Sequence, residues 1–441
     1  MYYLHPDLMR TVSHVFDAMA AFGNIELVRY LHDIGAPASY FAMNLASTLS
    51  IVQFLHDNRT EGCTTDAMDN AAADGRLDIV LFLHQHRTEG CTTGAMDTAA
   101  ANGHLDVVKF LHRNRTEGCS NKALILAAGN GHLDVVQFLH HNRTEESSMF
   151  QAMNNAASNG HLEVVTFLHH NRDEGCTTKA GDNAAANGHL DVLTFLFENR
   201  DEGCTGEAFS MAARNGNLAI VQYLNHMPRD ELVSTLASSA MNQAAAEGHL
   251  DVVEYLHNHS TFGCTAYAMV MAATNGHLSV VEWLHTNRTE VCGPKAMDMA
   301  ATNGHMSVVK YLHEHRTEGC TVDAMNGAAK NGHLDIIRFL HHNRTEGCTT
   351  KAMDLAARLG RLDIVQYLHH NRTEGCTDDA MRFAAAAGSG DVVQFLALQS
   401  NREVWTNSDG LRSSRWQLGS CAIPTRAQDR GLHCVGHASS G

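Results

Sequence analysis

The chain has little of what would place it in a membrane or on nucleic acid. No run of 18 apolar residues occurs, so we expect no transmembrane helix. The start at residues 1–7 lacks the basic and then apolar layout of a secretory signal peptide. The formal net charge is −16, whereas a surface that follows phosphates needs clustered Lys and Arg. We therefore expect no membrane partner, and a nucleic-acid partner is not favoured.

Signals of catalysis are also missing. No Gly-rich phosphate loop follows a strand pattern, and no isolated set of Ser, His and Asp stands out from the rest of the sequence. We therefore expect no enzyme activity, no small-molecule substrate, no cofactor and no metal.

What the sequence does contain is one phrase of about 28 residues, repeated along nearly the whole chain. The clearest copy spans residues 95–112, and its connector follows at 114–119. The same phrase restarts at Ala67, Ala95, Ala123, Ala152, Ala180, Ala208, Ala240, Ala268, Ala296, Ala324, Ala352 and Ala380, with less regular copies near Ala18 and Ala42. A repeat of this length is typical of a solenoid, in which each unit contacts only its neighbours.

Each copy predicts two short helices. In residues 105–112 the apolar residues recur three and four apart, which is helical spacing with a wide apolar arc. In residues 95–100 the apolar face is thinner, and its alanines allow close approach. Thr92 or Thr93 is the expected N-cap, and Gly103 is expected to end the first helix in the left-handed conformation. We expect Asn114 to end the second helix in the same conformation.

Cysteine and histidine recur at fixed positions of the repeat. Ten of the twelve cysteines, from Cys63 to Cys376, occupy the same position of the repeat, one in each copy that has it. Stacked helices lie about 8–10 Å apart, which is too far for disulfides between neighbouring copies, so we expect free thiols in a reducing compartment. Most histidines lie either in the turn or at the end of the second helix, once per repeat. Such spacing predicts structural roles rather than metal ligation.

The repeated phrase resembles the ankyrin repeat. That family's unit reads Thr-Pro-Leu-His-x-Ala-Ala and then Gly-His-Leu-Glu-Val-Val-Lys-x-Leu-Leu. Residues 95–100 stand where Pro-Leu-His-x-Ala-Ala would, and residues 103–111 match the second half almost residue for residue. The resemblance covers about residues 15–400. It implies a non-enzymatic protein-binding scaffold whose partners lie along a concave face built by the first helices.

Two departures from the family pattern matter. The ankyrin period is 33 residues, so these units are about five residues short, and the connector is too short for a full projecting finger. Asp69, Asp97 and Asp298 take the position of the family's first-helix histidine, and the family's proline is absent.

We predict an all-α solenoid of about 13 to 14 stacked ankyrin-like helix-turn-helix repeats with short connectors, over residues 1–400. Irregular stretches are the N-terminal copies at 1–64, the connector at 146–150, the insertion at 226–239 and the terminal repeat at 380–400. The insertion is either a surface loop or extra turn, a binding loop, or a bend. Residues 401–441 are expected to be a disordered tail, the alternatives being that Trp405 and Trp416 cover the last repeat or that the tail is unrelated.

The positions that vary between copies are either inert surface or the recognition surface. Met and aromatic side chains among them are adaptable anchors, although Met here could equally be core. The predicted partner-binding residues are Met211, Arg214, Gln243, Tyr267, Met271, Thr274, Lys295, Met299 and Lys330. The leading hypothesis is a protein-interaction scaffold with unidentified protein partners, in the cytoplasm or the nucleus. The alternative is a nucleic-acid-binding solenoid, which would need a basic stripe.

Overall fold

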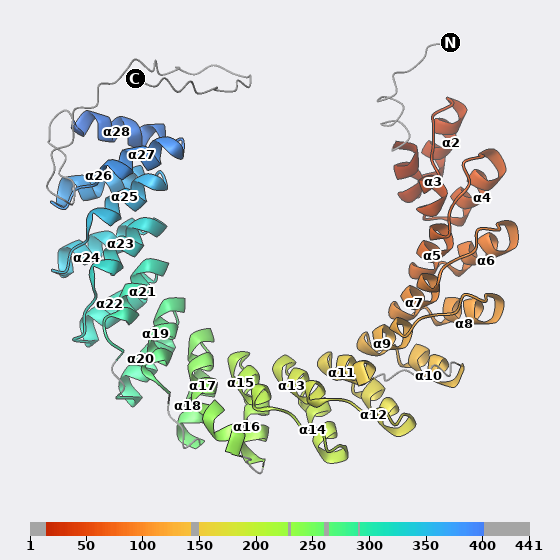
Figure 1. Cartoon of the computed structure of the whole chain (residues 1–441), viewed down its shortest axis with the longest axis horizontal. Helices are drawn as coiled ribbons and strands as arrows, with labels where there is room; N and C mark the ends of the chain where they lie inside the picture. The colour runs from red at the N-terminus through yellow and green to blue at the C-terminus, as the bar shows by residue number, and fades with distance from the viewer. Residues whose placement is uncertain (1–14, 143–149, 228–230, 260–263, 290–291, 401–441) are drawn as a thin grey trace, which may run out of the picture. The chain divides into compact units, whose positions relative to one another are not determined.

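The described part of the chain is built from helices. The computed structural model describes residues 15–142, 150–227, 231–259, 264–289 and 292–400, and no strand occurs among them (Figure 1). Residues 15–21 are the first helix of the first copy. The prediction of an all-α helical-repeat solenoid is confirmed.

Each repeat contributes two antiparallel helices. The first helices of the successive repeats are α3 (Phe41–Asn44), α5 (Asp66–Ala73), α7 (Thr93–Ala101), α9 (Lys122–Gly129), α11 (Phe150–Ser158), α13 (Thr178–Asn187), α15 (Gly206–Arg214), α17 (Glu231–Glu247), α19 (Ala266–Asn275), α21 (Lys295–Asn303), α23 (Val322–Asn331), α25 (Thr350–Arg358) and α27 (Asp378–Ala386). The second helices are α2 (Ile25–Asp33), α4 (Leu49–Asn58), α6 (Leu77–His86), α8 (Leu105–Asn114), α10 (Leu133–Asn142), α12 (Leu162–Asn171), α14 (Leu190–Asn199), α16 (Leu218–His226), α18 (Leu250–His259), α20 (Leu278–Asn287), α22 (Met306–His315), α24 (Leu334–Asn343), α26 (Leu362–Asn371) and α28 (Gly390–Ser400).

The helices fall into two compact units. Residues 1–300 and 307–319 make the first unit, and residues 301–306 and 320–441 make the second. The boundary lies away from the insertion at 226–239. That residues 1–400 form one continuous solenoid stays a prediction.

The first helix of a repeat begins and ends as its sequence predicts. Thr92 is extended and its hydroxyl accepts a hydrogen bond from the backbone N–H of Gly94, so it is the N-cap of α7. Ala95, Met96, Ala99 and Ala100 are buried on one face of the helix. Gly103 follows with φ of 78°, a left-handed conformation that glycine adopts at little cost.

The second helix ends differently from the prediction. In α8, Val107, Val108 and Leu111 are buried, and each is worth roughly 1.5–3 kcal/mol of hydrophobic stabilisation. Asn114 remains helical, and the next residue, Arg115, is extended with φ of −124°. The expectation that Asn114 takes a left-handed conformation was wrong. Its side chain instead donates to the Phe110 carbonyl oxygen at 2.8 Å, which satisfies the last turn without a change of handedness.

Neighbouring repeats pack unequally on their two sides. In the first unit, adjacent first helices such as α7 and α9 contact along most of their length, whereas adjacent second helices such as α8 and α10 contact at fewer positions. The small alanines of the first helices permit this close approach. The pairs therefore fan apart on the second-helix side, and the first helices line the inner side of the arc of this unit (Figure 1).

One hydrogen-bond ladder joins the first helix to the start of the next repeat wherever the ladder position carries Asp or Asn, whereas α9, α15 and α19 carry Ile125, Ser210 and Val270 there. Asp97 accepts from the backbone N–H of Ser120 at 2.7 Å and from its hydroxyl at 2.6 Å. Asp69 likewise accepts from the backbone N–H and the hydroxyl of Thr92. The side-chain amide of Asn154 accepts from the backbone N–H of Thr177 and donates to its hydroxyl. Aspartate and asparagine thus make a side-chain ladder where the ankyrin resemblance places histidine.

A second ladder runs along the Asn-Gly-His turns. The Asn102 side chain donates to the Ala73 carbonyl oxygen at 2.8 Å, at the end of the preceding first helix. The His104 ring lies against Gly75 of the preceding turn, where a Cβ atom would come within 2.5 Å of His104 Nδ1. Glycine is therefore required here both for its positive φ and for its missing side chain.

A third ladder follows the connectors. Arg115 forms an ion pair with Glu117, and Glu117 Oε1 also accepts from the Cys91 N–H of the preceding repeat at 3.5 Å. The Arg115 guanidinium, with backbone N–H groups assisting, lowers the pKa of Glu117 to about 2. At the adjoining helix end, the His112 ring meets the Phe138 ring of the next repeat edge-on, with centroids 5.5 Å apart.

The irregular copies keep the ladders with local changes. Asp17 accepts from Ser39, as Asp97 does from Ser120, so the first copy begins at Val15, three residues before Ala18. The insertion lengthens a first helix, because α17 starts at Glu231, nine residues before Ala240. The irregular connector at 146–150, apart from Phe150, and the tail at 401–441 lie outside the described residues.

Replacing a turn glycine by alanine tests whether the histidine ring of the next repeat fills the space that the new Cβ atom would need. At Gly103 a Cβ atom would lie 2.6 Å from His132 Nδ1. Gly103→Ala is therefore destabilising for two reasons: alanine is strained at a positive φ, and the histidine ring has to move. We expect a loss of about 2–4 kcal/mol in unfolding free energy, measured by urea denaturation. Gly203→Ala is the control, because its φ is also positive and nothing lies within 4 Å; it should lose about 1 kcal/mol. Equal losses would contradict the packing role.

The connector ion pair predicts a pH-dependent contribution from Glu117. Its pKa is about 2 in the folded chain against a usual 4.5, so folding favours the ionised form. Its contribution is therefore complete above about pH 4.5 and is lost as the pH falls toward 2. Glu117→Gln should cost about 1–2 kcal/mol of unfolding free energy at pH 6, and this difference should shrink between pH 4.5 and 3. The exposed Glu254→Gln is the control for the removal of one negative charge, and a pH-independent cost at Glu117 would contradict the account.

Candidate binding surface

The first helices expose a regular row of side chains between their buried positions. On α19 the buried residues are Ala268, Met269, Val270, Ala272 and Ala273, which face the neighbouring helices. The exposed row of the same helix carries Tyr267, Met271 and Thr274 at helical spacing. The buried residues of the helix therefore fix where this row lies. The side chains on the row itself are not needed for packing, and they set its charge and polarity.

The structure places all nine predicted binding residues on this row. The exposed ones are Met211, Arg214, Tyr267, Lys295 and Lys330, and the half-buried ones are Gln243, Met271, Thr274 and Met299. Methionines of the core differ clearly from those of the row, since Met269 is 4% exposed and Met211 is 37% exposed. These methionines are therefore not core residues, and their role in binding stays a prediction.

Part of this set forms a continuous strip. Helix α17 packs against both α15 and α19, so Met211 and Arg214, then Gln243, then Tyr267 and Met271 follow one another across three repeats. Lys295 and Met299 lie on α21 of the first unit, whereas Lys330 belongs to the second unit. Eight of the nine predicted residues therefore lie in the first unit, and Lys330 lies in the second.

Hydrogen bonds and ion pairs hold some side chains of the strip in place. Arg214 Nε lies 3.3 Å from Glu247 Oε1, which joins α15 to α17. Thr274 donates its hydroxyl hydrogen to the Val270 carbonyl oxygen at 2.6 Å, within α19. Both partners of the Arg214 pair are about half exposed, so the pair adds little stability and can exchange for a partner's charge.

Sequence reasoning missed four exposed apolar residues on the same row. They belong to the irregular N-terminal copies and are Phe22, Tyr40, Phe41 and Leu45. The signal was present, because aromatic residues stand at positions that are polar in the regular copies. The irregular phrase hid it, since the first copy begins three residues before Ala18.

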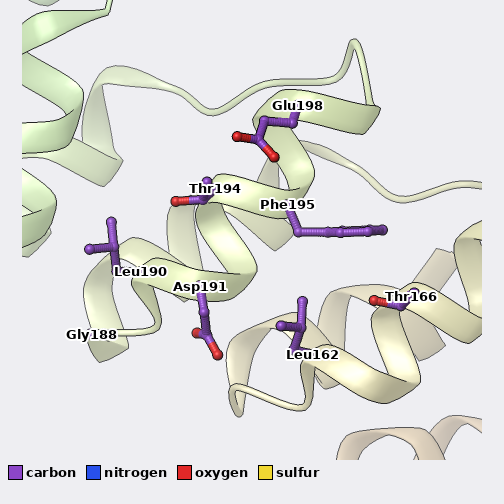
Figure 2. Close-up of a pocket in the computed structure, with 8 residues that line it drawn as sticks. All are labelled: Leu162, Thr166, Gly188, Leu190, Asp191, Thr194, Phe195 and Glu198. Carbon is purple, nitrogen blue, oxygen red and sulfur yellow. The ribbon is translucent and has the colours of Figure 1, made fainter.

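A cavity of about 720 Å³ lies on the second-helix side, between α12 and α14 (Figure 2). It is lined by Leu162, Thr166, Gly188, Leu190, Asp191, Thr194, Phe195 and Glu198. Thr166 and Thr194 stand where the adjoining repeats carry the longer Gln137 and Gln222, so the groove between the splayed helices is left open. None of the predicted binding residues lies here.

The connector thiols are poor nucleophiles. The ten connector cysteines are free, as predicted, and none of them forms a disulfide. Burial, with the charge of a neighbouring glutamate, raises the pKa of Cys91, Cys176 and Cys348 to about 11. Thiols with such a pKa are almost fully protonated at neutral pH, so they serve the packing rather than covalent chemistry.

Two further findings concern metals and membranes. Within the ranges that the structure describes, no three His, Cys, Asp or Glu side chains are arranged to hold a metal ion. Over the same ranges, no helix combines the length and the hydropathy needed to cross a membrane.

Comparison with known families identifies the fold. A family model described as ankyrin repeats (3 copies) matches residues 95–182, 182–269, 209–291, 241–326 and 269–354. A second, described as ankyrin repeats (many copies), matches residues 68–112 and 352–397. Together they span most of the chain, which therefore belongs to the ankyrin-repeat family.

Comparisons with individual proteins add little. No curated protein matches the chain. Among solved structures, the chain is similar to the pentatricopeptide repeat protein PPR10 from maize, at 11% identity and a TM-score of 0.31, over 90% of this chain and 64% of that one. A likeness at this TM-score carries no argument about function.

Proposed function

We propose that this chain is a non-enzymatic protein-interaction scaffold. Its recognition surface is the long concave face of the first helices, and its partner is a protein. The contacts are made by the strip at Met211, Arg214, Gln243, Tyr267 and Met271, by Thr274, Lys295 and Met299 of the same unit, and by Lys330 of the second unit.

The observation that carries the proposal is the separation of framework from surface within each first helix. Ala268, Ala272 and Ala273 are 0% exposed and recur from copy to copy because packing requires them. Tyr267 beside them is 57% exposed and has no counterpart in the other regular copies. A side chain that the fold does not require, on a face that membership of the ankyrin family associates with partners, is a candidate contact.

The residue types also fit protein recognition. Tyr267 offers a large rigid surface with few rotatable bonds, and methionines adapt to irregular partner surfaces. The row of the first unit carries charges of both signs, among them Lys179 on α13, Glu207 on α15 and Lys295 on α21. This pattern favours a protein with mixed charge over the regular phosphates of a nucleic acid.

The free thiols support a location in a reducing compartment. Ten buried or half-buried cysteines form no disulfide, and oxidising compartments would expose each folding chain to mispairing. We therefore place the scaffold in the cytoplasm or the nucleus.

Substitution on α19 tests the proposal. Tyr267→Ala with Met271→Ala should weaken partner binding about 30-fold or more, because a buried aromatic anchor contributes about 2 kcal/mol or more. Proximity labelling in cells, followed by mass spectrometry, identifies the proteins that depend on these two residues, and titration of the purified proteins gives the affinities.

The matched control lies on the second helices of the adjoining repeats. Glu254→Ala with Glu282→Ala changes two exposed residues of α18 and α20 and should leave binding unchanged. Both variants should melt at the wild-type temperature. Partners that are lost only in the second-helix variant would show that the recognition surface is on the other side.

A further inference from the structure

The first-helix face of the two N-terminal repeats exposes an apolar cluster found in no regular copy. Phe22 is 80% exposed, Tyr40 42%, Phe41 45% and Leu45 47%. We call these four residues the N-terminal aromatic patch. The equivalent row on α5 carries Asp66, Asn70 and Asp74, which are the small polar residues expected on a solvated face.

The copy that carries Tyr40, Phe41 and Leu45 has a shortened first helix. Helix α3 has four residues, and its copy lacks the Asn-Gly-His turn. Ser47 takes the place of the turn histidine, since a Cβ on Gly23 would lie 2.8 Å from Ser47 Oγ. In regular copies an asparagine such as Asn102 stands where Phe22 stands here and bonds to the preceding repeat. Phe22 at this position of the first copy is 80% exposed.

The remaining members of the patch share one helix face. The rings of Tyr40 and Phe41 lie 4.4 Å apart between centroids, inclined by 33°. Leu45 follows Phe41 by one helical turn, and its N–H donates to the Phe41 carbonyl oxygen at 3.0 Å. Tyr40, Phe41 and Leu45 therefore make an exposed apolar surface on one helix, of the kind that marks interaction sites on soluble proteins.

Negative charge borders this surface. Asp66 and Asp74 lie at the two ends of α5, the next first helix, and Asp74 is exposed. Asp66 receives only a long hydrogen bond, 3.4 Å, from Asn44. Arg76, two residues after Asp74, donates to the Ser47 carbonyl oxygen and lies 3.4 Å from Asp78. The border therefore presents carboxylates, and the aromatic faces themselves attract cations.

We propose that the N-terminal aromatic patch binds a partner segment that carries Lys or Arg next to a large apolar side chain. This inference rests on the proposed function and names the chemistry of the partner. The apolar side chain covers Tyr40, Phe41 and Leu45, and the cation pairs with Asp66 or Asp74. A second copy of this chain is a poor occupant, because each copy carries a net charge of −16.

Selection from a random dodecapeptide phage library against the full chain tests the proposal. We expect enriched peptides that combine Lys or Arg with Trp, Phe or Leu. Synthetic versions should lose at least about tenfold in affinity on Tyr40→Ser with Phe41→Ser, and about threefold on Asp66→Asn with Asp74→Asn, the latter loss fading at high salt. Leu359→Ser is the control, because Leu359 is 51% exposed at the end of another first helix, and it should change nothing.

The other outcomes separate this inference from the proposed function. Peptides that are acidic, or that depend on Tyr267 and Met271 alone, overturn the inference and leave the first-helix scaffold intact. Peptides that depend on neither set, or no enrichment, overturn both. Enriched peptides that match residues 1–14 or 401–441 show that the chain covers its own patch, and dimerisation abolished by Tyr40→Ser with Phe41→Ser shows self-association; each overturns the partner assignment.

Discussion

Each repeat of this protein depends on hydrogen bonds that only its neighbour can supply. The backbone N–H that opens one repeat is capped by the side chain that follows the buried methionine of the repeat before, as Asp97 does for Ser120. The carbonyl that ends a first helix is bonded by the asparagine of the next turn, as Asn102 does for Ala73. Because one or both of these bonds recur at most of the described junctions, the fold is a chain of pairwise contacts rather than one shared core.

This dependence explains which residues can vary. A turn glycine must stay glycine wherever a histidine of the next repeat lies on it, whereas the row of the first helices is exposed or half-buried and is less constrained by packing. The framework thus leaves one surface chemically free along many copies. The irregular N-terminal copies show the converse, since the copy with the shortened α3 exposes Tyr40, Phe41 and Leu45. Variation is tolerated either on the free row or where a junction has been rebuilt.

Most of the fold could be predicted from the sequence, because the information is local and repeated. Helical spacing, the threonine N-cap and the turn glycine each act within a few residues, and all were correct for α7. The end of α8 was mispredicted, because Asn114 satisfies the helix through its side chain, and the sequence alone does not distinguish this from a left-handed turn. The nine predicted residues are exposed or half-buried on the first helices, while their binding role is a proposal. The aromatic patch was missed because its copies are out of phase with the regular phrase.

Native-state hydrogen exchange on Asn154→Leu tests the central claim most directly. Asn154 bonds through its amide to the N–H and the hydroxyl of Thr177, so the substitution removes one junction between α11 and α13. The account predicts that protection falls in these two helices and recovers with distance along the first unit, whereas Asn155→Leu, an exposed neighbour, changes little. An equal loss of protection throughout the unit would contradict it, because the repeats would then share a single cooperative core.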